Sequence, residues 1–351
     1  MAGNTIQADS LADLVAGTLR DLGRFKWTDI MTATQDHVAW NRLMQEKKIK
    51  FDDGYGIQFN VQYQTSGAAR HLGLFEVDDV DVADTMVQGN IPWRHGETKM
   101  AIEKREISMN RGKSRIFDLI KTRQADAMTD WAETFEDAFW VKPSSSSDLT
   151  QPFGVTYWIV YNATAGFNGG NPSGFTSGAA GLDVATYTRW KNYSVNYTTV
   201  SKTDLVRKIR KAATFTRFRS PIRTNIQPYD TGTNFGYYTN YNVIGTLEEL
   251  LEDQNENLGN DVASKDGDVM FRRNPVVWVP NLEDRTGDPV FGINWGVFKP
   301  VFLRGEFMRQ SGPNNTSGAQ RNVIKTFWDT SYNNVCYDRR KCFVAATADP
   351  G

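Results

Sequence analysis

Apolar and polar residues alternate over one short stretch of the chain. In Tyr55–Tyr63 every second residue is apolar, namely Tyr55, Ile57, Phe59, Val61 and Tyr63. A period of two predicts a β-strand with one buried face. A second extended stretch, Lys99–Met109, carries charges on both faces. The two stretches predict a long two-stranded ribbon, and Ser66–Gly96 between them, rich in Gly and Asp, gives that ribbon an acidic end.

The longest helical pattern begins near Lys113. Its apolar residues recur at steps of three, four and seven and form one stripe: Ile116, Ile120, Ala127, Trp131, Phe135 and Phe139. The pair Lys142-Pro143 ends the pattern, because a proline disfavours helical backbone in the residue before it. A helix of about 28 residues results, and it has a length of about 40 Å.

Shorter elements are predicted on both sides of this helix. Gln7–Gly23 has the period of an amphipathic helix and is followed by an extended arm. Ser144–Thr199 has the composition of short strands and loops. A second helix is expected after Ser201 as N-cap, with Asp204 in its first turn, and a third helix over Thr246–Asn257. Strands are expected at Val276–Val279, Val297–Phe298, Val301–Leu303, Val323–Trp328 and Cys342–Ala346.

Charge and cysteine usage restrict the partners. The 351 residues include 40 Lys and Arg against 41 Asp and Glu, so the net charge is -1. Such a surface offers no general attraction to nucleic acid or to an anionic membrane. No run approaches a membrane span and no secretory pattern opens the chain, which predicts a soluble protein made in a cytosol. Cys336 and Cys342 fit no zinc motif and are expected to be reduced packing residues.

Motifs for nucleotide and metal chemistry are incomplete. The histidines have no metal-ligand spacing: they are His37, His71 and His95. Gly112-Lys113-Ser114 resembles the end of a phosphate-binding loop, but Ile107 stands where that loop needs a glycine. The tripeptide is therefore interpreted as a turn that leads into the long helix.

A calcium-like pattern is also incomplete. The first ligand positions are present as Asp253, Asn255 and Asn257. The required glycine and glutamate are replaced by Leu258 and Ser264. A carboxylate pair of the glycosidase kind stays open, because so many acidic residues always offer pairs, but none stands out. The sequence therefore predicts no enzyme, no catalytic residue, no cofactor and no metal site.

One charge pattern rises above the background. The ribbon's end is acidic, and basic residues gather at Arg111, Lys113 and Arg115 and along Arg207–Arg219. These are either solvated faces or surfaces on which acid from one copy of the chain meets base on the next. Under the second interpretation the candidate contacts between subunits are Glu76, Asp78, Asp79, Asp81, Asp84, Arg207, Arg210 and Lys211.

The order of elements resembles that of a known fold. An arm, a long hairpin, a spine helix, a β-rich region and returning strands are arranged as in the major capsid proteins of tailed phages, the α+β Hong Kong 97-type fold. Several stretches are also similar to capsid proteins of short-tailed and related phages: Tyr237–Asn240, Asp253–Gly259, Phe271-Arg272, Pro275–Pro280 and Asn334–Arg340.

The resemblance implies a division of the chain. Residues 1–50 would be an N-terminal arm and 51–111 an extended loop that overlaps a neighbour. Residues 112–142 would be the spine helix of a peripheral domain, 143–312 an axial domain, and 313–351 returning peripheral strands. Some members begin with a cleavable internal scaffold, for which this chain has no room. Because Met1 opens the sequence, a separate scaffold protein is expected rather than a processed chain.

The resemblance also implies function and partners. Many copies, as hexamers and pentamers, would form an icosahedral head shell that encloses double-stranded DNA without sequence-specific binding. A scaffold protein and a portal are expected partners, a decoration protein is optional, and no membrane is involved. The chain would reside in the virion after assembly in the host cytoplasm. Two alternatives stay open: an encapsulin-like shell around cargo enzymes, and a carbohydrate-binding or glycoside-cleaving β-protein suggested by the Asn- and aromatic-rich stretch Tyr157–Tyr197.

Overall fold

The computed structural model describes residues 36–44, 49–75, 83–103, 105–106, 113–217, 235–255, 269–272, 274–315 and 322–351, without the side chains of 113–121, 251–255 and 312–315. The helix predicted over Gln7–Gly23 lies outside them. The chain divides into two compact units. Unit 1 contains the described residues of Met1–His37, His95–Phe135 and Gly305–Ser331, and unit 2 those of Val38–Arg94, Glu136–Arg304 and Tyr332–Gly351.

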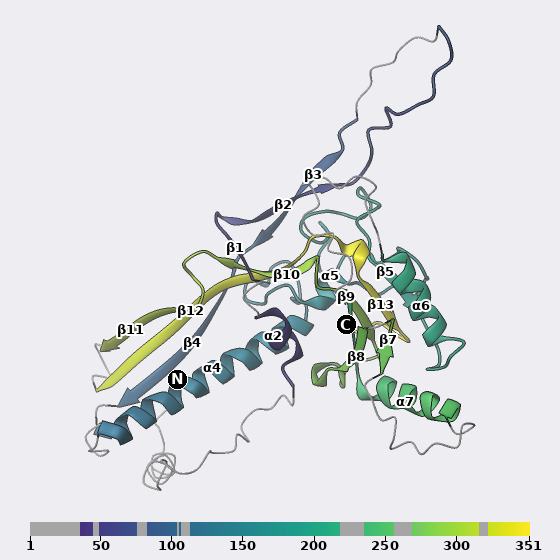
Figure 1. The fold of residues 1–351 in the computed structure, drawn as a ribbon. Coiled ribbons are helices and arrows are strands. Elements are labelled where there is room, and N and C mark those ends of the chain that lie inside the picture. The colour runs from purple at the N-terminus through teal and green to yellow at the C-terminus, as the bar shows by residue number, and fades with distance from the viewer. Residues whose placement is uncertain are drawn as a thin grey trace. The chain divides into compact units, whose positions relative to one another are not determined.

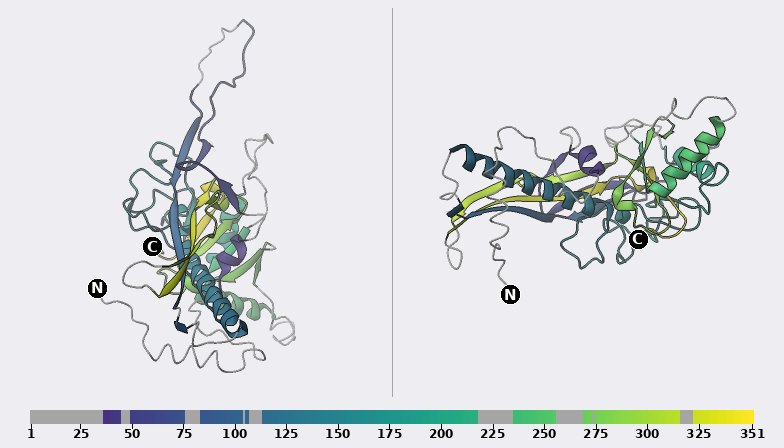
Figure 2. Two further views of the ribbon diagram at one scale, coloured as in Figure 1. Left: turned by 90° about the vertical axis from the view of Figure 1, so that its left-hand side faces the viewer. Right: turned by 90° about the horizontal axis from the view of Figure 1, so that it is seen from below.

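Unit 1 is built from strands and most of the long helix. Its strands belong to β4 (Arg94–Glu103), β11 (Arg309–Asn315) and the first part of β12 (Val323–Cys336), and its helix is α4 (Lys113–Trp140) up to Phe135. β11 runs antiparallel to β12, with Arg309 opposite Asp329, and β4 also pairs with β12. In Figures 1 and 2 this part of α4 runs alongside β4.

The contact between α4 and β4 depends on the apolar stripe predicted for the helix. The described stripe residues Ala127, Trp131 and Phe135 are buried. The Trp131 ring occupies the space beside Gly96, where an added Cβ would lie 2.2 Å from it. Arg123 on α4 donates 2.6 Å to the carbonyl of Ala101, so a polar contact accompanies the apolar packing.

Unit 2 is organised around a six-stranded mixed sheet in the order β5-β13-β9-β6-β8-β7. The strands are β5 (Tyr193–Asn196), β6 (Phe235–Thr239), β7 (Met270–Phe271), β8 (Asn274–Trp278), β9 (Val290–Asn294) and β13 (Phe343–Ala346). Helices α6 (Leu205–Phe215) and α7 (Tyr241–Asn255) pack on it. Unit 2 also holds α2 (Val38–Leu43), the short helix α5 (Val155–Trp158), and β1 (Lys50–Asp52), which pairs with β10 (Phe298–Leu303).

The predicted ribbon is present with a different partner strand. β2 (Gly56–Gln62) alternates between buried or half-buried and exposed residues, as predicted. Tyr55, which the prediction placed on the buried face, precedes the strand and is fully exposed. It pairs with β3 (Met86–Pro92), with Gly56 opposite Pro92 and Gln62 opposite Met86. The expectation that Lys99–Met109 forms the second strand is wrong, because those residues up to Glu103 belong to β4 in unit 1. The predicted stretch had two charged faces, whereas β3 supplies Ile91 to the covered face.

The C-terminal end of α4 and the start of α2 meet at a buried carboxylate within unit 2. Glu136 is fully buried and accepts hydrogen bonds from the backbone amides of Ala39 (3.0 Å) and Trp40 (2.8 Å). Its Oε1 also accepts from the indole of Trp140 at 2.8 Å. Free amides at the start of a helix attract a negative charge, so Glu136 caps α2 from another part of the chain.

The shorter elements agree with the predictions in kind and differ in their ends. α7 begins at Tyr241, five residues before the predicted Thr246, because Asn240 Oδ1 accepts from the amide of Val243 and acts as N-cap. α6 begins at Leu205, and Ser201 Oγ accepts from the amide of Asp204 in the turn before it. Of the predicted strands, Val323–Trp328 extends to Cys336. Cys336 and Cys342 are both buried and free.

Gly154 permits the closest backbone approach to the end of α4. A Cβ at this position would lie 2.0 Å from the carbonyl oxygen of Val141 and 2.5 Å from that of Phe139. Backbone atoms cannot move aside as a flexible side chain can. We therefore expect Gly154→Ala to destabilise the protein by about 1–3 kcal/mol, the usual cost of overpacking.

Gly170→Ala is the matched control, since nothing lies within 4 Å of its Cβ position. Chemical denaturation followed by tryptophan fluorescence measures both changes. Equal stability of the two variants would contradict the close approach at Gly154.

Candidate assembly surfaces

The base of the ribbon packs on its own unit. Phe59 on β2 makes an edge-to-face contact with Tyr337, with ring centroids 5.5 Å apart, and lies 6.2 Å from the ring of Trp190. The amide of Asn90 on β3 donates 3.0 Å to the carbonyl of Ala180. The covered face of β2 and β3 therefore packs on unit 2 itself.

A buried cation fixes the loop on which the ribbon rests. Arg339 is fully buried, and its guanidinium donates to the carbonyls of Trp158 (2.7 Å), Trp190 (3.1 Å) and Gly170 (2.9 Å) and to Asn192 Oδ1 (3.2 Å). Burial lowers the pKa of Arg339 to about 10, so the group is still charged at neutral pH. The guanidinium holds its N–H donors in a fixed planar geometry, so it fixes the position of Trp190. Trp190 in turn contacts Phe59 of the ribbon.

Beyond β2 and β3 the ribbon is exposed. Tyr63 and Gln64 donate to the carbonyl of Asp84, at 3.0 and 2.7 Å, and so join the two sides of the hairpin just past the strands. Leu74 and Phe75 are 93% and 100% exposed. Phe75 also has a positive φ of 67°, which is unusual for a bulky residue. Large apolar side chains exposed at the end of a projecting hairpin are typical of a surface that another molecule covers.

The second surface is the outer face of α6. Leu205, Ile209, Ala212 and Ala213 are buried, and they leave Arg207, Arg210 and Lys211 exposed on the opposite side. Among the described residues no carboxylate forms an ion pair with these three cations. The Lys211 ammonium lies 5.8 Å from the centroid of the Phe215 ring, which is itself half exposed.

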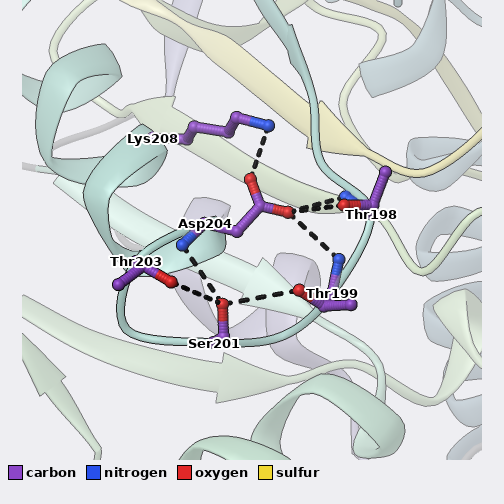
Figure 3. Close-up of polar contacts among 6 residues, drawn as sticks. All are labelled: Thr198, Thr199, Ser201, Thr203, Asp204 and Lys208. Atoms are coloured by element: carbon purple, nitrogen blue, oxygen red, sulfur yellow. Dashed lines mark hydrogen bonds and ion pairs between the residues drawn. The ribbon is translucent and has the colours of Figure 1, made fainter.

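The start of α6 is held by a network around Asp204 (Figure 3). One carboxylate oxygen forms an ion pair with Lys208 at 2.5 Å. The other accepts from the amides of Thr198 (2.8 Å) and Thr199 (3.1 Å) and from the Thr198 hydroxyl (3.0 Å). Lys208 and these donors hold the pKa of Asp204 well below its ordinary value. The network holds the start of the helix and engages Lys208, while the other basic side chains of α6 form no ion pair with any described residue.

The third surface is the outer face of α7. Val243 and Leu247 are buried, while Glu248 and Glu249 are exposed, as predicted for that helix. Tyr241, at its start, is 64% exposed. No described cation forms an ion pair with Glu248 or Glu249. Unit 2 therefore carries one basic and one acidic helix face.

The structure describes only some of the predicted contact residues. Asp84 is exposed at the ribbon, and Arg207, Arg210 and Lys211 lie together on α6. The other candidates, Glu76, Asp78, Asp79 and Asp81, lie outside the described residues. The apolar residues Leu72, Leu74 and Phe75 were missed, although three large apolar residues within a Gly- and Asp-rich stretch already indicated a contact site.

The described residues contain no group of three His, Cys, Asp or Glu side chains arranged to hold a metal ion. Among the described helices, none has the length and hydropathy that crossing a bilayer requires.

Comparison with known proteins identifies the fold. No family model and no curated protein sequence matches the chain. Solved structures do match. The capsid asymmetric unit of cyanophage A-1(L) superposes with a TM-score of 0.64 at 13% identity, over 92% of this chain and 96% of that chain. The capsid of the native GTA particle superposes with a TM-score of 0.56 at 10% identity, over 95% and 98%. The chain therefore has the α+β fold of phage capsid subunits, as the order of elements predicted.

We expect the Asp204 network to make stability depend on pH. Asp204→Asn should lower the free energy of unfolding by about 1–3 kcal/mol at pH 7, because a charged acceptor is lost. Since folding depresses the pKa of Asp204, its contribution is complete above the unfolded value, near 3.9, and is lost as the pH falls through the lower folded value. Denaturation of both proteins from pH 7 down to pH 3 should show their difference shrinking below about pH 4.

Lys208→Met serves as the control, because it removes the ion pair but keeps the amide hydrogen bonds. Its cost should be only about 0–1 kcal/mol. A difference between wild type and Asp204→Asn that stays constant over the whole pH range would rule out the carboxylate as the cause.

Proposed function

We propose that the chain is a major capsid protein, many copies of which assemble into the icosahedral head shell of a tailed phage around packaged double-stranded DNA. The observation that carries the proposal is the extent of the likeness: the fold of the cyanophage capsid subunit is shared over nearly the full length of both chains. The similarity therefore involves a whole shell subunit rather than one common motif. Under this proposal the chain acts through its surfaces and not as an enzyme.

The proposed partners follow from the family resemblance. They are other copies of the chain in hexamers and pentamers, a separate scaffold protein, a portal and an optional decoration protein. DNA is enclosed without sequence-specific contacts, which agrees with a net charge of -1. The proposed place of the protein is the virion, after assembly in the host cytoplasm.

The division of the chain is likewise a proposal. We assign 1–50 to an arm, 51–111 to the extended loop, 112–142 to the spine helix, 143–312 to the axial domain and 313–351 to the returning strands. Among the described residues of the extended loop, β2 and β3 form the paired ribbon. The eight charged candidates on the ribbon and on α6 are proposed as contacts between subunits.

The exposed end of the ribbon supports self-assembly on energetic grounds. Leu74 and Phe75 are almost completely exposed in the single chain. Burying a side chain of this size is worth about 1.5–3 kcal/mol. A shell repeats such a contact at every subunit, so a modest gain for each copy is enough to favour the closed assembly.

We expect the expressed chain, alone or with its candidate scaffold, to form closed particles of uniform size in negative-stain microscopy. Particles purified from a phage lysate should contain nuclease-protected double-stranded DNA. Closed particles that hold enzymes instead of DNA would favour the encapsulin-like alternative. A chain that stays monomeric with every candidate partner would contradict the shell proposal.

A shortened ribbon tests the role of its exposed end. We expect replacement of residues 65–83 by an Asn-Gly turn to abolish shells, because the hairpin then ends where Gln64 meets Asp84 and the apolar end is gone. The thermal melt of the subunit should be nearly unchanged, since β2, β3 and their contacts with Trp190 and Tyr337 remain.

The triple variant Leu72→Ser, Leu74→Ser, Phe75→Ser is the matched control for loop length. It keeps the full loop and removes only the apolar contacts, so it should also fail to form shells. Sedimentation velocity separates monomers from shells. Normal shells from both variants would show that the ribbon's end is not an assembly contact.

A further inference from the structure

Helices α6 and α7 of unit 2 pack on one face of the six-stranded sheet, toward opposite ends of its strand order. One continuous core contains Leu205 and Ile209 of α6, Val243 and Leu247 of α7, and sheet residues that lie in register on a single face: Tyr193, Val195, Tyr237, Val290, Phe343 and Ala345. α6 contacts β5 and β13, at one end of the strand order, and α7 contacts β8, near the other end (Figure 1).

The outer faces of these helices have opposite charge. α6 presents Arg207, Arg210 and Lys211, and α7 presents Glu248 and Glu249. On each helix the charged residues are three or four positions apart or adjacent, so they form one compact patch. No ion pair joins the two patches within the described part of the chain, which their placement at different ends of the sheet explains.

Oppositely charged patches at two separate places on one molecule suit a head-to-tail contact. In such a contact a surface of one copy meets a different surface of the next, and a rotation that closes produces a ring. We propose that the basic face of α6 in one copy packs beside the acidic face of α7 in the next copy, and that this contact closes the rings of the shell. The proposal rests on the proposed shell function and names the surfaces that carry out one part of it.

A second copy of the chain accounts for both charged patches, whereas the other candidate partners account for only one. A nucleic acid would pair with the cations of α6 and leave Glu248 and Glu249 unpaired. The acidic end of a neighbour's ribbon would also account for only the basic patch. A second copy satisfies both patches with the same contact, and it places a helix against a helix, with both elements fixed by a shared core. Charge complementarity of this kind selects partner and register.

Charge exchange tests the contact. The variant Arg207→Glu, Arg210→Glu should lose the shell peak in sedimentation velocity, and so should Glu248→Lys, Glu249→Lys. Combining all four substitutions in one chain should restore shells, because every copy then presents an acidic α6 and a basic α7. Both single-helix variants should keep the melting temperature of the wild type, since the substituted residues are exposed and form no ion pair with any described residue.

Arg189→Glu, Lys202→Glu is the matched control. It makes the same change in net charge at exposed positions of unit 2 outside the α6 face, and it should form shells normally. If the α6 variant is rescued by Asp78→Lys, Asp79→Lys, Asp81→Lys instead, the ribbon is the partner and the proposal is wrong. Normal shells from the α6 variant, with or without weaker DNA retention, would also overturn it. In both cases wild-type shells would leave the shell function itself intact.

Discussion

Burial of one stripe of α4 is the interaction on which most of the described structure depends. In unit 1, Trp131 fills the space beside Gly96 and joins the helix to β4. In unit 2, Phe139 stacks on Trp295 and meets Phe298 edge to face, at centroid distances of 5.9 and 5.4 Å. The same end of the helix supplies Glu136, whose carboxylate caps α2. A helix of 28 residues thus acts as the common element from which each unit builds its own core.

The base of the ribbon is fixed by buried contacts within unit 2. Its base is held by Phe59 against Trp190 and Tyr337, and Trp190 is in turn held by the buried guanidinium of Arg339. A buried arginine with neutral acceptors is costly to desolvate, so it persists only where its geometry is well matched. As a consequence, the paired strands β2 and β3 are held in place at Phe59. The ribbon's apolar residues Leu74 and Phe75, by contrast, are left exposed.

Charge is distributed in unit 2 so that it is balanced overall but separated locally. Asp204 neutralises Lys208 inside a hydrogen-bonded turn, whereas the remaining cations of α6 and the carboxylates of α7 have no described ion-pair partner. Weak exposed pairs contribute little to the stability of one chain. They gain importance when the same contact is repeated many times, which is the situation of a shell subunit.

Local patterns in the sequence determined the kind and position of the main elements. The period of two in Tyr55–Tyr63 and the apolar stripe of the long helix correspond to β2 and α4, because alternation and helical spacing act within one element. Tertiary structure alone decided the pairing of β2 with Met86–Pro92, the fixing of Trp190 by Arg339, and the placement of α6 and α7 at opposite ends of one sheet face. These depend on contacts between residues far apart in the chain. A single sequence does not encode such contacts in any local period, since many strands offer an equally apolar face.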